Sequence, residues 1–135
     1  MQVERLDHIN IITDRLDETA EWYAQMLDLE RRDAPPPMTP RTGQWMYDAR
    51  GIAIIHINSL EFKRTFDRPV TPGTPTGAVH HVALRMQGYE EAVARLKTHG
   101  AAYRENFVEA INLRQIFTTD PNNVLLELNF FAEAN

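Results

Sequence analysis

Three histidines and one glutamate recur at matched spacings along this chain. His8 and His81 are 73 positions apart, and His56 and Glu127 are 71 positions apart. Imidazole and carboxylate groups are common ligands of divalent transition metals. The chain contains no cysteine, so such an ion must take its protein ligands from His, Asp and Glu. The four residues are therefore candidate metal ligands.

Each candidate lies in a segment that alternates between polar and apolar residues, which is typical of a β-strand with one buried face. In the last such segment Glu127 and Asn129 share one face, and Leu128 points to the other. The three histidines have similar surroundings in three other segments. His80 precedes His81 and is expected to point to the opposite face, as a structural residue. The apolar faces are expected to pack against helices, and the polar faces to line one concave surface.

The elements around these residues repeat along the chain. The first half predicts a strand at 3–13, a helix at 14–29, a loop at 34–40 and two strands within 43–58 joined by a turn at 48–51. The second half predicts a strand at 78–86, a helix at 88–99, a strand at 101–107 and a hairpin at 111–131 with a turn at 120–123. Asp14 or Asp17 is expected to cap the first helix, and Gly100 to end the second. We interpret both halves as strand, helix and three strands, an internal duplication.

The duplication predicts one domain made of two modules. Module one is expected at 1–58, a linker at 59–77 and module two at 78–135. The linker ends in a stretch rich in proline, threonine and glycine, which favours neither helix nor strand.

The composition limits the class of partner. A net charge of −5 and a pI near 5.5 argue against nucleic acid or an anionic membrane surface. No segment is apolar over enough residues to span a membrane, and the first residues do not resemble a signal peptide. We therefore expect a cytoplasmic enzyme or binding protein that acts on a small molecule.

Four segments together resemble the vicinal oxygen chelate superfamily, which includes glyoxalase I, fosfomycin resistance proteins, extradiol dioxygenases and bleomycin resistance proteins. They are LDHINI, DETAEWYAQMLDL, HHVAL and FTTDPNNVLLELNF. The segment DPNNVLLEL is similar to the family's DP-x-G-x-x-x-E-L ending, with Asn123 in place of the usual glycine. The resemblance covers nearly the whole chain apart from the proline-rich loop and the linker. It implies an α+β fold of two tandem βαβββ modules, with an open, cup-shaped mixed sheet and the helices outside.

The resemblance also implies one divalent metal ion per site, with Fe, Mn, Ni, Co and Zn all compatible. His8, His81 and Glu127 match the family's ligands. His56 lies where glyoxalase I has a fourth, glutamate ligand, which fosfomycin resistance proteins and dioxygenases lack, so the role of His56 stays open. The family's ion binds a substrate through two neighbouring oxygens and acts as a Lewis acid. A base is needed as well, and Glu127 and His56 are the candidates.

Four further residues are candidates for substrate binding. Trp45 and Tyr47 share a strand face and can form an apolar wall, with core packing as the alternative. Asn10 flanks a candidate ligand on its strand and can donate a hydrogen bond. Arg114 and Gln115 face opposite ways, so only one reaches the site. Arg114 is predicted to hold a carboxylate, with an ordinary surface arginine as the alternative.

These residues predict a metal-dependent lyase or isomerase of the glyoxalase type. One alternative is an extradiol-type Fe(II) dioxygenase that cleaves a catechol-like ring. Another is a non-catalytic protein that sequesters a drug or metabolite, as bleomycin resistance proteins do. A homodimer is expected, because relatives of this size commonly pair modules across chains and open sheets have edges to protect. Whether the modules pair within a chain or between chains is left open.

Overall fold

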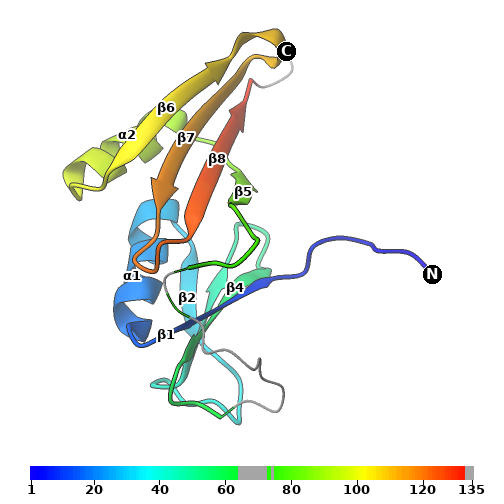
Figure 1. Cartoon of the computed structure of the whole chain (residues 1–135), viewed down its shortest axis with the longest axis vertical. Helices are drawn as coiled ribbons and strands as arrows, with labels where there is room; N and C mark the ends of the chain where they lie inside the picture. The colour runs from blue at the N-terminus through cyan, green and yellow to red at the C-terminus, as the bar shows by residue number, and fades with distance from the viewer. Residues whose placement is uncertain (64–72, 74, 133–135) are drawn as a thin grey trace. The chain divides into compact units, whose positions relative to one another are not determined.

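The computed structural model describes residues 1–63, 73 and 75–132, which form two compact units (Figure 1). Unit 1 comprises residues 1–73 and unit 2 comprises residues 74–135. The boundary falls inside the predicted linker, part of which lies outside the described residues. Each unit contains one α-helix and one four-stranded mixed sheet. The eight strands thus form two sheets, one in each unit.

The elements of unit 1 follow the predicted order of strand, helix and three strands. They are β1 (Ile9–Thr13), α1 (Leu16–Leu27), β2 (Glu30–Asp33), β3 (Gly43–Tyr47) and β4 (Ala53–Ser59). The sheet order is β1-β4-β3-β2, with β1 parallel to β4 and the other pairs antiparallel. The apolar side of α1 covers one face of this sheet, where Met46, Ile55 and Ile57 are fully buried.

Unit 2 repeats this arrangement. Its elements are β5 (Val82–Arg85), α2 (Tyr89–Thr98), β6 (Tyr103–Val108), a short 3-10 helix (Glu109–Ile111), β7 (Leu113–Thr119) and β8 (Leu125–Phe131). The sheet order is β5-β8-β7-β6, and β5 is again parallel to its neighbour. Leu126, Leu128 and Ile116 are buried on the helix face, and Tyr89 of α2 packs edge-on against Phe130. The predicted βαβββ duplication is confirmed.

The strand register also confirms the alignment of the two halves. Asn10 of β1 lies opposite His56 of β4, and Ala83 of β5 lies opposite Glu127 of β8. Asn10 and Ala83 are separated by the 73 positions that separate His8 and His81. His56 and Glu127 therefore occupy the same position in the two sheets.

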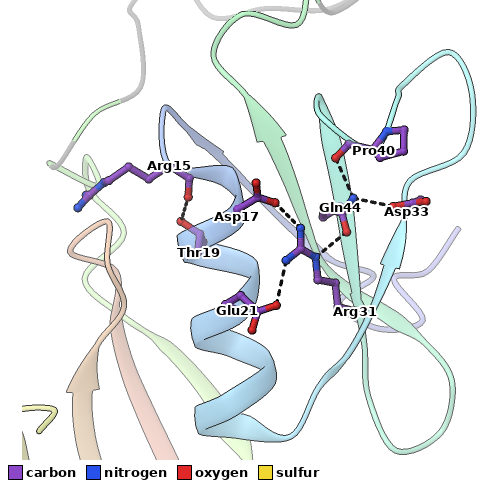
Figure 2. Close-up of polar contacts among 8 residues, drawn as sticks. All are labelled: Arg15, Asp17, Thr19, Glu21, Arg31, Asp33, Pro40 and Gln44. Atoms are coloured by element: carbon purple, nitrogen blue, oxygen red, sulfur yellow. Dashed lines mark hydrogen bonds and ion pairs between the residues drawn. The ribbon is translucent and has the colours of Figure 1, made fainter. Parts of the chain in front are cut away.

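Arg31 ties α1 to the strands of unit 1 (Figure 2). Its guanidinium group donates to Asp17 over 2.5 Å and to Glu21 over 3.1 Å on the helix, and to Gln44 of β3 over 2.7 Å. Gln44 is buried and donates in turn to Asp33 of β2. The charged strand β2 is held to the helix by this polar network instead of by apolar packing.

Some predicted boundaries differ from the structure. β1 begins at Ile9 and β5 at Val82, so residues 3–8 and 78–81 precede their strands. The capping prediction was wrong, because Arg15 occupies the N-cap of α1 without a side-chain capping bond. Asp17 bonds to Arg31 instead. The second helix ends as expected, with the C-cap His99 followed by Gly100 in the left-handed conformation at φ +66°.

Candidate metal centre

Three aromatic rings stack on one face of the sheet of unit 1, opposite the face that α1 covers. His56 of the central strand β4 lies between Trp45 of β3 and His8. The ring centroids of His56 and Trp45 are 4.0 Å apart with an interplanar angle of 7°. Those of His56 and His8 are 3.8 Å apart at 14°. The fold therefore brings the two candidate ligands of unit 1 into direct contact.

Asp7 fixes the orientation of the His8 ring. The Nδ1 atom of His8 lies 2.5 Å from Oδ2 of Asp7. This hydrogen bond, with the charge of the imidazole, lowers the pKa of the Asp7 carboxyl. A histidine whose Nδ1–H donates to a carboxylate has its Nε2 lone pair available for a metal ion. Asp7 is thus a candidate support of His8 that the sequence pattern did not indicate.

The environment of His56 favours its neutral form. Burial is the main cause of its lowered pKa, and the neighbouring His8 is the second. A desolvated imidazole next to another histidine loses its proton more readily than a solvated one.

The stacked geometry limits what His56 can bind. An imidazole donates its lone pair within the plane of its ring. The planes of His8 and His56 are nearly parallel and do not meet near either nitrogen. In this arrangement the two rings cannot both bind one ion at the 2.0–2.1 Å that zinc–nitrogen bonds require. At most one of these two histidines can therefore bind a given ion in this arrangement.

Unit 2 brings its own pair of candidates together. Nε2 of His81 lies 4.0 Å from Oε1 of Glu127, whose side chain is 19% exposed. Two donors that each lie about 2.1 Å from one zinc ion are at most about 4.2 Å apart. The observed separation is within this upper limit but exceeds the about 3.4 Å that a tetrahedral angle gives, so a small side-chain rotation would bring both atoms to one ion.

His80 holds His81 much as Asp7 holds His8. The Nδ1 atoms of the two adjacent rings are 3.0 Å apart, which leaves Nε2 of His81 facing Glu127. The prediction that His80 points away from His81 was wrong, because both residues precede the start of β5 at Val82 and strand alternation does not govern them. Asp7 and His80 occupy matching positions in the repeat, 73 apart, and this spacing was the available signal.

The polar neighbours of Glu127 lie on its own face of the sheet. Asn129 donates from Nδ2 to Oε2 of Glu127 over 2.9 Å, and Gln115 of β7 donates to Asn129 over 3.0 Å. Arg114 lies on the other face, where it pairs with Glu90 at 3.1 Å and stacks over the ring of Tyr89 at 3.5 Å. Gln115, and not Arg114, thus shares the face of Glu127.

The predicted substrate residues of unit 1 lie beside the ring stack. Asn10 accepts a hydrogen bond from Asn58 over 2.9 Å. Tyr47 lies under the guanidinium group of Arg32, 4.3 Å away. Nε1 of Trp45 and Oδ1 of Asn58 are buried without a hydrogen-bond partner among the described residues. A buried donor and acceptor left unpaired are unusual in a folded protein and are suited to a polar ligand.

Neither unit holds a complete metal site by itself. Within each unit, the part of the chain that the structure describes contains no group of three or more His, Asp or Glu residues able to hold an ion. Unit 1 offers His8, and unit 2 offers His81 and Glu127.

A hollow of about 520 Å³ in unit 1 lies around the Arg31 network. Its lining includes Asp17, Arg31, Asp33 and Gln44, which bond to one another or to nearby backbone. It lies on the helix side of the sheet, away from the histidines, so we do not place the functional site there.

A family comparison identifies the superfamily of the chain. The model of the Glyoxalase/Bleomycin resistance protein/Dioxygenase superfamily matches residues 5–128. The chain belongs to this superfamily. The match includes both units and all four candidate ligands. A comparison with curated proteins gave no match.

Solved structures share the fold at low sequence identity. A protein from the mobile metagenome of V. Pseudocholerae has a TM-score of 0.74 at 12% identity, covering 98% of both chains. A virulence protein from Salmonella typhimurium has a TM-score of 0.72 at 14% identity, covering 98% of this chain and all of that one. A fosfomycin resistance protein from Listeria monocytogenes has a TM-score of 0.65 at 20% identity, covering 97% and 96%. These likenesses establish the fold of this superfamily member.

Proposed function

We propose that this superfamily member is a metal-dependent enzyme of the glyoxalase type, a lyase or isomerase acting on a small substrate with two neighbouring oxygens. His8, His81 and Glu127 would hold one divalent ion, of Fe, Mn, Ni, Co or Zn. The donor set of two imidazoles and one carboxylate suits these metals and leaves coordination positions for substrate. When bound, the ion supplies Lewis-acid polarisation of the substrate oxygens.

The proposal rests on one observation above all. Nδ1 of His8 contacts Asp7 and Nδ1 of His81 contacts His80, which leaves both Nε2 atoms available. In unit 2, Nε2 of His81 faces Glu127 at 4.0 Å. A ligating histidine in proteins nearly always bonds through its second nitrogen to a supporting group. Two matching supports in a duplicated chain are difficult to explain by surface solvation alone.

His56 and Trp45 have separate roles in this proposal. His56 lies beside His8 without being placed to share its ion, so it is the candidate proton acceptor. Trp45 forms the wall behind it, and its unpaired Nε1–H is available to a substrate oxygen. Tyr47 and Asn10 extend the same polar and aromatic surface. Arg114 is left out, because it lies on the opposite face of its sheet from Glu127.

A second candidate is an extradiol-type dioxygenase that uses Fe(II) and oxygen on a catechol-like ring. The stacked, non-ligating geometry of His56 and the adjacent indole favour this candidate, since they combine a three-ligand site with an aromatic wall. Sequestration of a small molecule without reaction is the third possibility, and the retained donor set argues against it.

One assay separates the three. Protein reconstituted with Fe(II), Mn(II) or Zn(II) is offered a catechol and, separately, a 2-oxoaldehyde–thiol adduct while oxygen is recorded. Turnover of the adduct without oxygen uptake is the expected result. Oxygen uptake with a yellow product would indicate the dioxygenase, and stoichiometric binding without turnover would indicate sequestration. The variant His81→Ala controls for metal-independent reaction.

We also propose a homodimer in the cytoplasm. Both sheets have two edge strands, and open edges are commonly covered by association. None of the described helices is long and apolar enough to cross a membrane. The ligands of one ion can come from one chain or from two, and both arrangements use the same residues.

A further inference from the structure

Three side-chain amides form a line across the sheet of unit 2 and end on Glu127. Asn106 of β6, Gln115 of β7 and Asn129 of β8 are direct cross-strand partners on one face. Asn106 donates to Gln115 over 2.8 Å, Gln115 to Asn129 over 3.0 Å, and Asn129 to Oε2 of Glu127 over 2.9 Å. We call these three residues the amide relay.

The carboxylate of Glu127 determines which group of each amide in the relay donates and which accepts. An ionised carboxylate only accepts hydrogen bonds, so Asn129 must turn its NH₂ group toward Glu127. Its carbonyl oxygen then faces Gln115, which must present its own NH₂ group. Gln115 in turn offers its carbonyl oxygen to Asn106. Each amide thus fixes the next, and Gln115 is 9% exposed, so water competes little for its groups.

We propose that the amide relay reserves Oε2 of Glu127, so that this residue presents Oε1 alone to a metal ion beside His81. Gln115 is the positioning residue at its centre. The inference rests on the proposed metal site. It adds that Glu127 binds the ion through one oxygen. Hydrogen bonds that begin two strands away, at Asn106 of β6, set the orientation of its side chain.

Unit 1 lacks the corresponding line of amides. The residue opposite Asn58 in its sheet is Gly43, which has no side chain to continue a relay. Asn58 instead turns its NH₂ group toward Asn10. The relay therefore occurs in the unit that carries the carboxylate ligand, and it is absent where the matching residue is the stacked His56.

The variant Gln115→Glu gives the sharpest test, because two explanations predict opposite signs. A new negative charge near a cation site should tighten binding of Mn(II) or Zn(II) by simple attraction. In the relay, however, a carboxylate at 115 only accepts hydrogen bonds. It draws the NH₂ group of Asn129 away, and a carbonyl oxygen then faces Glu127. We expect Zn(II) affinity to fall by about 10-fold to 100-fold, the range for lost support of a metal ligand.

Three further variants control for structural damage. Gln115→Met keeps the size but makes no hydrogen bond, and should weaken Zn(II) binding less than Gln115→Glu does. Asn106→Leu alters only the exposed end of the relay and should have the smallest effect of the relay variants. Arg114→Met changes the neighbouring residue on the opposite face and should leave Zn(II) affinity unchanged. Thermal unfolding of each variant checks that the fold is kept.

A measurement on metal-free protein separates failure of this inference from failure of the proposed function. The side-chain carboxyl ¹³C resonance of Glu127 responds to the hydrogen bond from Asn129. It should shift in Gln115→Glu and stay in place in Arg114→Met. An unmoved resonance in Gln115→Glu, or tighter Zn(II) binding by that variant, would overturn the relay. Wild-type protein that binds no Zn(II) or Mn(II) would instead overturn the proposed metal site, and the resonance would still decide on the relay.

Discussion

His56 is held on both faces of its ring, by Trp45 on one side and His8 on the other. The ring of His56 can affect the site through its stacking contacts and through its nitrogen atoms. Two substitutions separate these effects. Phenylalanine at this position keeps a flat ring between the same neighbours but removes both nitrogens. Alanine removes the ring as well and leaves a cavity next to Trp45.

We expect His56→Phe to retain one bound divalent ion and to lose turnover. The reason is that the near-parallel planes exclude His56 from any ion that His8 would bind. Metal content after dialysis, measured by mass spectrometry, and turnover in the same sample give the two results. A loss of metal as complete as in His81→Ala would identify His56 as a fourth ligand.

Tyr89 provides a pH-dependent prediction away from the site. Burial raises the pKa of its phenol above the ordinary 10.0, and its hydrogen bond to Glu105 adds to the shift. The folded state therefore favours the neutral phenol. The resulting stability is fully present below pH 10 and is lost as pH rises through the folded-state pKa. The difference between the ultraviolet titration curves of wild type and Tyr89→Phe should show the phenol of Tyr89 ionising at a pH above its ordinary pKa. Glu105→Gln should bring the pKa closer to 10, and an unshifted phenol in wild type would contradict the assignment.

Residue identity and the spacings of 73 and 71 positions were enough to select the four candidate ligands, because a duplicated chain repeats residues at matching positions. The same signals did not identify Asp7 and His80, the residues that contact the candidate ligand histidines. Asp7 and His80 act from just outside their strands, where alternation gives no direction. The alternation of side chains along a strand placed Arg114 and Gln115 on opposite faces of the sheet. It did not show which of the two shares the face of Glu127. The pairing of Gln115 with Asn129 decides that, and pairing is a property of the folded sheet.

At the level of elements, α1 and β2 are joined by charge where most contacts in unit 1 are apolar. Arg31 is 25% exposed, while Asp17 and Glu21 are 82% and 55% exposed. Exposed ion pairs contribute little, about 0–1 kcal/mol each. The bond from Arg31 to buried Gln44 matters more, because its loss leaves a buried acceptor unsatisfied.

We therefore expect Arg31→Leu to lower the free energy of unfolding by about 1–3 kcal/mol. The matched variant Glu21→Gln, which weakens only an exposed ion pair, should cost less than about 1 kcal/mol. Urea unfolding followed by tryptophan fluorescence measures both. Equal losses in the two variants would show that Gln44 does not depend on Arg31.

This network also explains why β2 was not located from the sequence. Its residues, ERRD, have no apolar face and would normally suggest a loop or a helix end. Arg31 and Asp33 can face the helix side only because Gln44 and α1 supply partners. The strongly patterned elements α1, β4, β7 and β8 were predicted to within a few residues, since burial of one face sets their period.

On the scale of the whole molecule, the duplication gives two similar units that each hold an incomplete donor set. The proposed dimer should have a molar mass in solution that is twice the 15.6 kDa of the chain. Analytical ultracentrifugation at several protein concentrations measures this. A single species at the chain mass over the whole range would exclude the dimer, and the ligands would then have to come from one chain.

Binding of Mn(II) to single-ligand variants from both units tests the central claim most directly. Wild-type protein should bind one Mn(II) per chain by equilibrium dialysis, with a simplified electron paramagnetic resonance signal. His8→Ala and Glu127→Ala should each abolish the same binding event, because both side chains are proposed ligands of one ion. If His8→Ala bound Mn(II) as wild type does while Glu127→Ala did not, His8 would not be a ligand of that ion and the account would be wrong.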